Sequence, residues 1–139
     1  MRNHRMNQLL KYAYLNTDYY IDASDAPFKL NIGHYSSELY QLHQKFSVNT
    51  SLYITAWNPL SEQLTNRENN AKQKILVSEI TGLGFDMITG RGIAQSGDWP
   101  PDESIVVLGC DESTAITLSQ QYHQYADVFS GQISPPRLL

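Results

Sequence analysis

Alternation of apolar and polar positions predicts the strands of this chain. Residues 28–32 alternate with a period of two, the pattern of a half-buried strand, and Gly33 ends the run. Residues 51–57 alternate in the same way, whereas 105–108 form a continuous apolar run that is typical of a central strand covered on both faces. Further strands are predicted at 19–23, 86–93 and 126–130.

Apolar residues at helical spacing predict four helices. One begins at Ser36 or Ser37, because a serine side chain can accept a hydrogen bond from a free backbone N–H, and His43 lies on its apolar face. His43 is predicted to be a packed histidine rather than a ligand. Two other short helices are predicted, one at 6–15 and one that begins after Asp111 as its N-cap.

The longest predicted helix begins at a capping box. Thr65 and Glu68 are spaced so that each side chain can bond the backbone N–H of the other. The helix is predicted to run to about Thr81, before the glycines Gly82 and Gly84. The residues predicted to face the core are Ala71, Ile75, Leu76, Ile80 and Leu83.

The order of these elements, α-β-β-α-β-α-β-β-α-β, predicts the α+β fold class. We expect a layered domain with a mixed five- to six-stranded sheet and about four helices, mainly on one face. Because 139 residues is the size of one domain, residues 1–139 are expected to form a single domain. Within it, 1–17 are expected to be an N-terminal basic helix or arm, and 134–139 a flexible tail.

Composition narrows the class of protein. With 41% apolar and 17% charged residues, the chain is expected to fold without a metal or a disulfide, and its one cysteine, Cys110, excludes an internal disulfide. No apolar run approaches the ~20 residues of a membrane span and no signal peptide opens the chain, so a cytoplasmic protein is expected.

Charge is unevenly distributed. The net charge of −4 lacks the basic footprint that most nucleic-acid-binding proteins show. Residues 1–17 nevertheless carry +3, from Arg2, Arg5 and Lys11, whereas 98–139 carry −5. Either the two ends are simply solvated, or they make complementary contacts within one chain or across a homodimer. A monomer and a homodimer both fit this pattern.

Short blocks of sequence follow one another in a recognisable order. They are YITAWNP at 53–59, Glu68-Asn69, Gly90-Arg91-Gly92, Trp99-Pro100, Glu103-Ser104 and 107–109. Over roughly residues 19–128 they resemble the bacterial family catalogued as domain of unknown function 3293. The chain departs from the pattern of that family at 93–95 and 122–126. The resemblance implies a bacterial cytosolic protein of one domain and implies no mechanism.

Two strand-to-helix turns are candidate ligand sites. Asn58 and Ser61 lie in the first, and residues 109–111 form the second. If the two strands are parallel neighbours, their carboxyl ends form a crevice in which helix N-termini can hold an anion. The alternative role of Asn58 and Ser61 is that of turn and cap residues. Asn58→Ala is predicted to abolish ligand binding at a cap-sized cost in stability of under ~2 kcal/mol.

The glycine-rich strand is a second candidate site. Gly90 and Gly92 indicate a bulge or a close approach of backbone. Arg91 between them can bind a carboxylate or a phosphate, and Trp99 can stack over a ligand as a lid. The alternative is a bulged edge strand with a surface arginine and a tryptophan packed over the core.

Acidic, cysteine and histidine residues give weaker signals. Asp102 and Glu103 point to opposite faces of a strand, so solvation is their expected role, as capping is for Asp111. Acidic neighbours oppose the ionisation of Cys110, which argues against a nucleophile. The four histidines are scattered, so no metal site is expected.

The function predicted from the sequence is a binding module for a small polar or anionic ligand, or for a protein partner. One alternative is an enzyme acting on a phosphorylated or carboxylated metabolite, with Glu68 or Glu103 as base and Arg91 as anchor, which requires one carboxylate to be buried. A second alternative is a nucleic-acid-associated regulatory protein. No cofactor and no membrane partner is predicted. The candidate ligand-binding residues are Asn58, Ser61, Glu68, Asn69, Arg91, Trp99 and Glu103.

Overall fold

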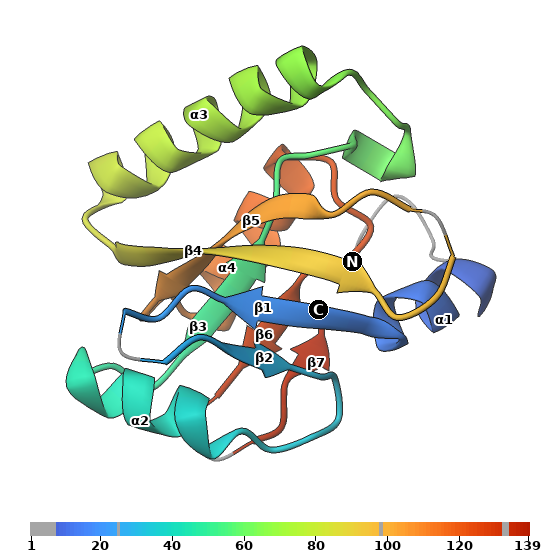
Figure 1. Ribbon diagram of the computed structural model, residues 1–139. Helices are drawn as coiled ribbons and strands as arrows, with labels where there is room; N and C mark the ends of the chain where they lie inside the picture. The colour runs from blue at the N-terminus through green and yellow to red at the C-terminus, as the bar shows by residue number, and fades with distance from the viewer. Residues whose placement is uncertain (1–7, 25, 98, 132–133) are drawn as a thin grey trace.

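The computed structural model describes residues 8–24, 26–97, 99–131 and 134–139, which form an α+β fold (Figure 1). These residues contain four α-helices, seven strands and a short 3₁₀ helix, η1 (Pro59–Ser61). The α-helices are α1 (Gln8–Leu15), α2 (Ser37–Lys45), α3 (Asn66–Leu83) and α4 (Glu112–Gln121). The strands are β1 (Thr17–Ile21), β2 (Phe28–Leu30), β3 (Ser51–Ile54), β4 (Asp86–Ala94), β5 (Asp102–Leu108), β6 (Val128–Ser130) and β7 (Arg137–Leu138).

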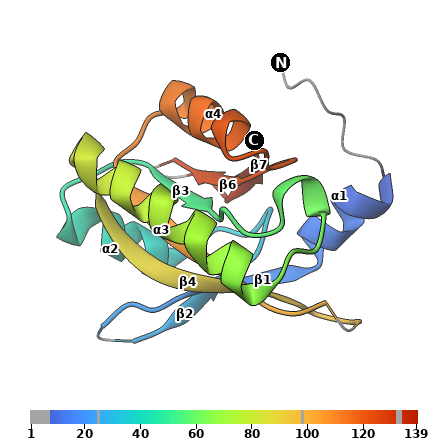
Figure 2. The ribbon, with the colours of Figure 1, turned by 90° about the horizontal axis from the view of Figure 1, so that it is seen from above.

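The seven strands join one antiparallel sheet in the order β2-β1-β4-β5-β3-β6-β7. The sheet curls, as the view from above shows (Figure 2). The prediction of a mixed sheet with five to six strands is therefore wrong in both respects. β3 and β4 do run in the same direction with α3 between them in the chain, but β5 lies between the two strands and is antiparallel to both.

The last residues of the chain supply the additional strand. Residues 134–139, expected to be a flexible tail, contain β7, which pairs with β6. Backbone hydrogen bonds hold the segment on both sides of β7, from Gly33 N to Pro136 O at 2.8 Å and from Leu139 N to Asp127 O at 3.0 Å. Proline lacks the N–H that a sheet uses, which favours a linker, but here Pro136 contributes its carbonyl instead.

The structure describes only part of the basic segment 1–17. Residues 8–17 form α1 and the start of β1. Arg2 and Arg5 lie outside the described residues, so both alternatives for the basic and acidic ends, solvation and a complementary contact, stay open.

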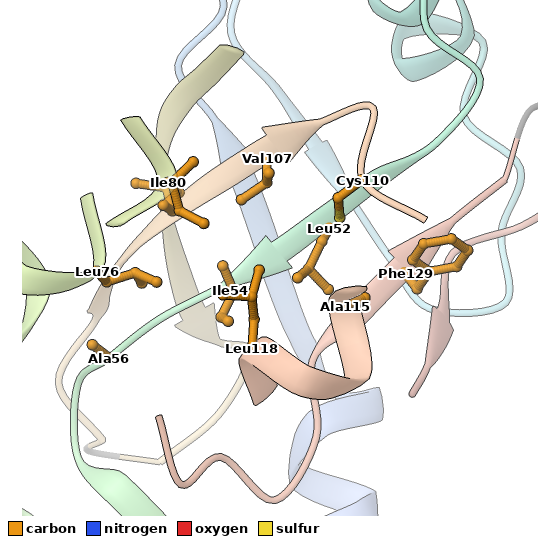
Figure 3. Packing of buried hydrophobic residues seen from close by; sticks show 11 residues of the cluster. Leu52, Ile54, Ala56, Leu76, Ile80, Val107, Cys110, Ala115, Leu118 and Phe129 are labelled. Atoms are coloured by element: carbon orange, nitrogen blue, oxygen red, sulfur yellow. The ribbon is translucent and has the colours of Figure 1, made fainter. Parts of the chain in front are cut away.

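Helices cover both faces of the sheet rather than mainly one. α3 and α4 share one face, where Leu76 and Ile80 of α3 and Leu118 of α4 pack against apolar residues of β3 and β5 (Figure 3). α2 covers part of the other face through Leu39 and Leu42. The core between the sheet and the α3/α4 layer comprises Leu52, Ile54, Ala56, Leu76, Ile80, Ile105, Val107, Cys110, Ala115, Leu118 and Phe129.

The buried stripe of α3 differs from the predicted stripe. Leu76 and Ile80 are buried as expected. The stripe then continues through two amides, Asn69 and Gln73, whose Oδ1 and Oε1 each accept a hydrogen bond at 2.9 Å from a backbone N–H of the segment after β3. A helix face that packs on polar backbone needs such acceptors, so the apolar pattern alone misplaces the stripe. The predicted core residues that are exposed instead are Ala71, Ile75 and Leu83.

Candidate functional site

A pocket of about 370 Å³ lies at one end of the sheet. At this end β1 and β5 begin, whereas β3 and β4 end. The pocket occupies the sheet face on which α2 packs further along, and α1 and η1 complete its walls. Both of these elements lie at the same end of the sheet in Figures 1 and 2. A volume of this size falls in the range of small-molecule sites, roughly 300–1,000 Å³.

Two tyrosines form the floor, from strands β1 and β3, which are separated in the sheet by β4 and β5. The rings of Tyr19 in β1 and Tyr53 in β3 meet edge to face, with their centroids 5.2 Å apart. Both hydroxyls donate to backbone carbonyls, Tyr19 to Tyr14 O at 2.8 Å and Tyr53 to Tyr20 O at 2.7 Å. Burial raises the pKa of both phenols far above the usual range, so both stay neutral. The floor is therefore aromatic and uncharged.

Gly90 makes the Tyr53 hydrogen bond possible. A Cβ at this position would lie 2.3 Å from Tyr20 O and 2.8 Å from the Tyr53 hydroxyl oxygen, distances that no side chain tolerates. The close backbone approach predicted for the glycine-rich strand is thus confirmed at Gly90. Gly92 is different, because a Cβ there would make only ordinary contacts, 3.6 Å to Thr17 Cγ2 and 3.9 Å to Tyr19 Cδ1, beside the pocket.

Both tryptophans of the chain line the pocket. Trp57, which follows β3, is 8% exposed, and its Nε1 is buried and has no hydrogen-bond partner among the described residues. Trp99 precedes β5 and is 44% exposed, so it stands at the rim. Its indole lies beside Asp102 and acts to lower the pKa of that carboxyl.

The charges that line the pocket are acidic. Asp102 and Asp127 belong to the lining, and no lysine, arginine or histidine does so among the described residues. Burial raises the pKa of Asp102 to about 6, although the hydrogen bond from Asn58 and the neighbouring indole of Trp99 favour its ionised form. Desolvation is the dominant effect on the pKa of Asp102, because burial takes the charged form of the carboxyl out of water.

A pair of buried asparagines positions this carboxylate. Asn58 Oδ1 accepts hydrogen bonds from Leu64 N and from Asn69 Nδ2, both at 2.9 Å. Because its oxygen holds two donors, the amide of Asn58 must turn its Nδ2 toward Asp102, to which it donates at 3.1 Å. The backbone N of Asn58 donates in turn to Asn69 Oδ1 at 2.9 Å.

Asn58 is thus a connector rather than a cap. Its backbone is left-handed, with φ 47° and ψ 62°, and its side chain makes no capping bond to η1. Asparagine tolerates this conformation better than most residues.

The structure brings three of the seven predicted site residues to the pocket. Asn58, Ser61 and Trp99 line it. Asn69, which is 1% exposed, lies directly behind Asn58 and contacts it through two hydrogen bonds. These four residues come from the turn after β3, the first turn of α3 and the loop before β5.

The other three predicted residues lie elsewhere. Glu68 is exposed at the start of α3, where it completes the capping box with Thr65. Arg91 and Glu103 are exposed on the opposite face of the sheet, because side chains alternate along a strand and their neighbours Gly92 and Asp102 line the pocket.

The predicted crevice between the two strand-to-helix turns does not form. β3 and β5 are antiparallel, with Ser51 opposite Leu108 and Ile54 opposite Ile105. The turn at 109–111 therefore lies at the start of β3, whereas Asn58 follows its end. Parallel pairing was a condition of the shared crevice, and the structure does not meet it.

Sequence reasoning missed Asp102 and the tyrosine floor. Asp102 was expected to be solvated, and it is instead largely buried in the pocket. Alternation along the strand could not single it out, because Asp102 has the same parity as the buried Val106 and Glu103 has the same parity as the buried Ile105. No local signal links Tyr19 to this site, since β1 reaches it through long-range pairing with β4.

The remaining candidates have structural roles. Cys110 is fully buried, and burial raises the pKa of its thiol to about 12. Asp111 caps α4 by accepting a hydrogen bond from Thr114 N, as predicted. His43 is 1% exposed and hydrogen-bonds Ser51 Oγ at 2.9 Å, which fits the predicted packed histidine. In the described ranges, no three histidine, cysteine or acidic side chains gather into a group that could hold a metal.

Fold and pocket together define an α+β protein with a curled antiparallel sheet and an acidic, aromatic pocket at one end. The family model described as Protein of unknown function (DUF3293) matches residues 54–126, more than half of the chain, and the chain belongs to this family. The match includes the Asn58, Asn69 and Asp102 network and leaves out α1 and β1. No curated protein and no solved structure matches the chain. No helix in the described part of the chain has the length and apolar character needed to cross a membrane.

Proposed function

We propose that this protein is a binding module that holds a small organic molecule in the pocket at the end of its sheet. The observation that carries the proposal is the pocket itself, which has a volume of about 370 Å³ and is lined by residues of α1, β1, β3, η1, β4, β5 and β6 and of the adjoining loops. Small-molecule sites are mostly apolar and aromatic, with a few fixed polar groups that orient the ligand. The two tyrosines and two tryptophans supply the first feature, and the carboxylate of Asp102 supplies the second.

The polar groups favour a neutral or positively charged ligand over an anionic one. Arg91, the expected anion anchor, is on the other face of the sheet, and the described lining holds carboxylates without a basic side chain. An anion placed there meets like charge, which costs several kcal/mol.

A second candidate function is an enzyme in which Asp102 exchanges a proton with the ligand. The enzyme expected from the sequence used Glu68 or Glu103 as base, and the exposure of both argues against it. Asp102 fits the role better, because a catalytic acid or base works best with a pKa near the operating pH and its pKa is about 6. Incubation of the identified ligand with the protein separates the two functions: a binding module returns it unchanged, and an enzyme consumes it.

The experiment that tests the proposed function is native mass spectrometry with a library of small fragments. Gly92→Leu is the informative variant, because the new side chain begins beside Thr17 and Tyr19 and fills the pocket without a backbone clash. Gly82→Leu is the matched control, since Gly82 lies on α3 and a Cβ there meets nothing within 4 Å.

Wild type and Gly82→Leu are expected to carry an added fragment mass, or one retained from the cell, that Gly92→Leu lacks. Equal loading of all three proteins, or no loading of the wild type by any fragment, contradicts the proposal.

A further inference from the structure

We propose that the pocket selects an organic cation, a compact ligand that carries a protonated or quaternary amine. This inference rests on the proposed function, since it names the chemical class of the ligand for the same pocket. Three features of the described residues support it: a positioned carboxylate, a set of aromatic rings and the absence of basic side chains from the lining.

The carboxylate of Asp102 has acceptor capacity to spare. An ionised carboxylate offers about four lone-pair sites; the side chain of Asn58 donates to one oxygen, and the indole of Trp99 lies beside the carboxylate. The remaining sites can accept from an ammonium N–H or lie against a quaternary nitrogen. The Asn58–Asn69 pair fixes the position of the carboxylate, so a ligand cation meets a charge that is already oriented.

An ionised Asp102 also lacks a counter-charge in the described lining. Taking a carboxylate out of water is costly unless a positive charge or several donors compensate it. The neutral side chains of Asn58 and Trp99 compensate part of this cost, but burial still has the largest effect on the pKa of Asp102. A ligand cation would supply the missing charge, whereas a neutral ligand of the same shape would leave the cost in place.

The aromatic walls favour the same ligand class. The faces of tyrosine and tryptophan rings carry negative potential and attract a cation within about 6 Å of the ring centre. Tyr19 and Tyr53 donate their hydroxyl protons to backbone carbonyls, so they present rings rather than hydroxyl donors to the pocket. Trp57 and Trp99 add two indoles to the same enclosure.

The test compares pairs of probes that have nearly the same shape, of which one member is a cation and the other is neutral. Choline is paired with 3,3-dimethylbutan-1-ol, in which carbon replaces the quaternary nitrogen, and benzylamine is paired with benzyl alcohol. Affinities are measured by isothermal titration calorimetry. Tryptophan fluorescence serves as a local reporter, because both tryptophans of the chain line the pocket.

The variants separate charge from shape. Asp102→Asn removes the charge of the carboxylate that Asn58 positions, at nearly constant side-chain volume. Glu103→Gln is the matched control, the adjacent carboxylate on the same strand but exposed on the opposite face.

We expect at least one ammonium probe to bind the wild type and Glu103→Gln about tenfold or more tightly than its neutral partner, since a buried cation site discriminates by that order. The preference is expected to vanish in Asp102→Asn. If neutral and charged partners bind equally and Gly92→Leu blocks both, the cation inference is overturned and the proposed function stands. If no ammonium probe binds, the inference is also overturned, and the fragment experiment decides the proposed function separately.

Discussion

Replacing Asp102 with asparagine should make the folded protein more stable at neutral pH, although it removes a residue of the site. Asp102 is largely buried, and burial raises its pKa from 3.8 to about 6. At pH 7 the wild type must therefore keep an unfavourably placed negative charge in the folded state. Asparagine resembles the protonated form, because it is neutral and its Oδ1 can still accept the hydrogen bond from Asn58.

The pKa difference sets the size and the sign of the effect. A rise of about two units at 1.36 kcal/mol per unit corresponds to about 3 kcal/mol. Between about pH 4 and pH 6 the folded state holds a proton that the unfolded chain has released, so this group makes wild-type stability fall as pH rises through that window. The gain from Asp102→Asn is then close to zero near pH 4 and grows to at most about 3 kcal/mol above pH 6.

Urea unfolding of the wild type, Asp102→Asn and Glu103→Gln at several pH values measures this directly. The free energy of unfolding of Asp102→Asn should exceed that of the wild type at pH 7 and converge with it near pH 4. Glu103→Gln should follow the wild type throughout, because Glu103 is exposed. A destabilised Asp102→Asn at pH 7, or a difference from the wild type that does not change with pH, would refute the burial of an ionised Asp102.

Three further predictions concern residues that shape the pocket or its surroundings. In urea unfolding, Gly90→Ala should lower the free energy of unfolding by about 3 kcal/mol, because the new methyl group clashes with Tyr20 O and breaks the hydrogen bond from Tyr53. Gly92→Ala should change it by no more than about 1 kcal/mol, and losses of similar size in the two variants would contradict the geometry. Asn58→Ala should cost about 3–5 kcal/mol, more than a cap, because it strands two buried donors in a left-handed turn; a loss under ~2 kcal/mol would restore the cap role. The thiol of Cys110 should react with a chromogenic disulfide only on unfolding, and rapid labelling of the native protein would show that it is accessible.

Local chemistry explains why most elements could be predicted. Ser36 caps α2, the Thr65–Glu68 capping box begins α3 and Asp111 caps α4, each as the sequence pattern indicates. Each of these caps depends on residues only a few positions apart, so a single sequence is enough to predict it. Strand pairing is a long-range property. Nothing local to β5 indicates that it inserts between β3 and β4, and this insertion makes the sheet antiparallel.

The site was predictable only as far as its residues are neighbours in the chain. The turn after β3 predicts Asn58 and Ser61 as site residues, and the tryptophan of the loop before β5 predicts Trp99 as a candidate lid; all three line the pocket. Arg91 was assigned to the same site because arginine suits anions, but strand alternation places it on the other face. The pocket also needs α1 and Tyr19 of β1, which the fold brings to Asp102 from the other end of the chain.

NMR mapping of ¹⁵N-labelled protein tests most directly whether small molecules bind in the pocket between α1, η1 and the end of the sheet. The two indole N–H resonances and the amides of Gly92 and Ser104 report on the pocket, since all four residues line it. Fragments that bind should shift these resonances in the wild type and leave them unmoved in Gly92→Leu. Shifts confined to other surfaces, or shifts of equal size in Gly92→Leu, would show that the pocket is not the binding site.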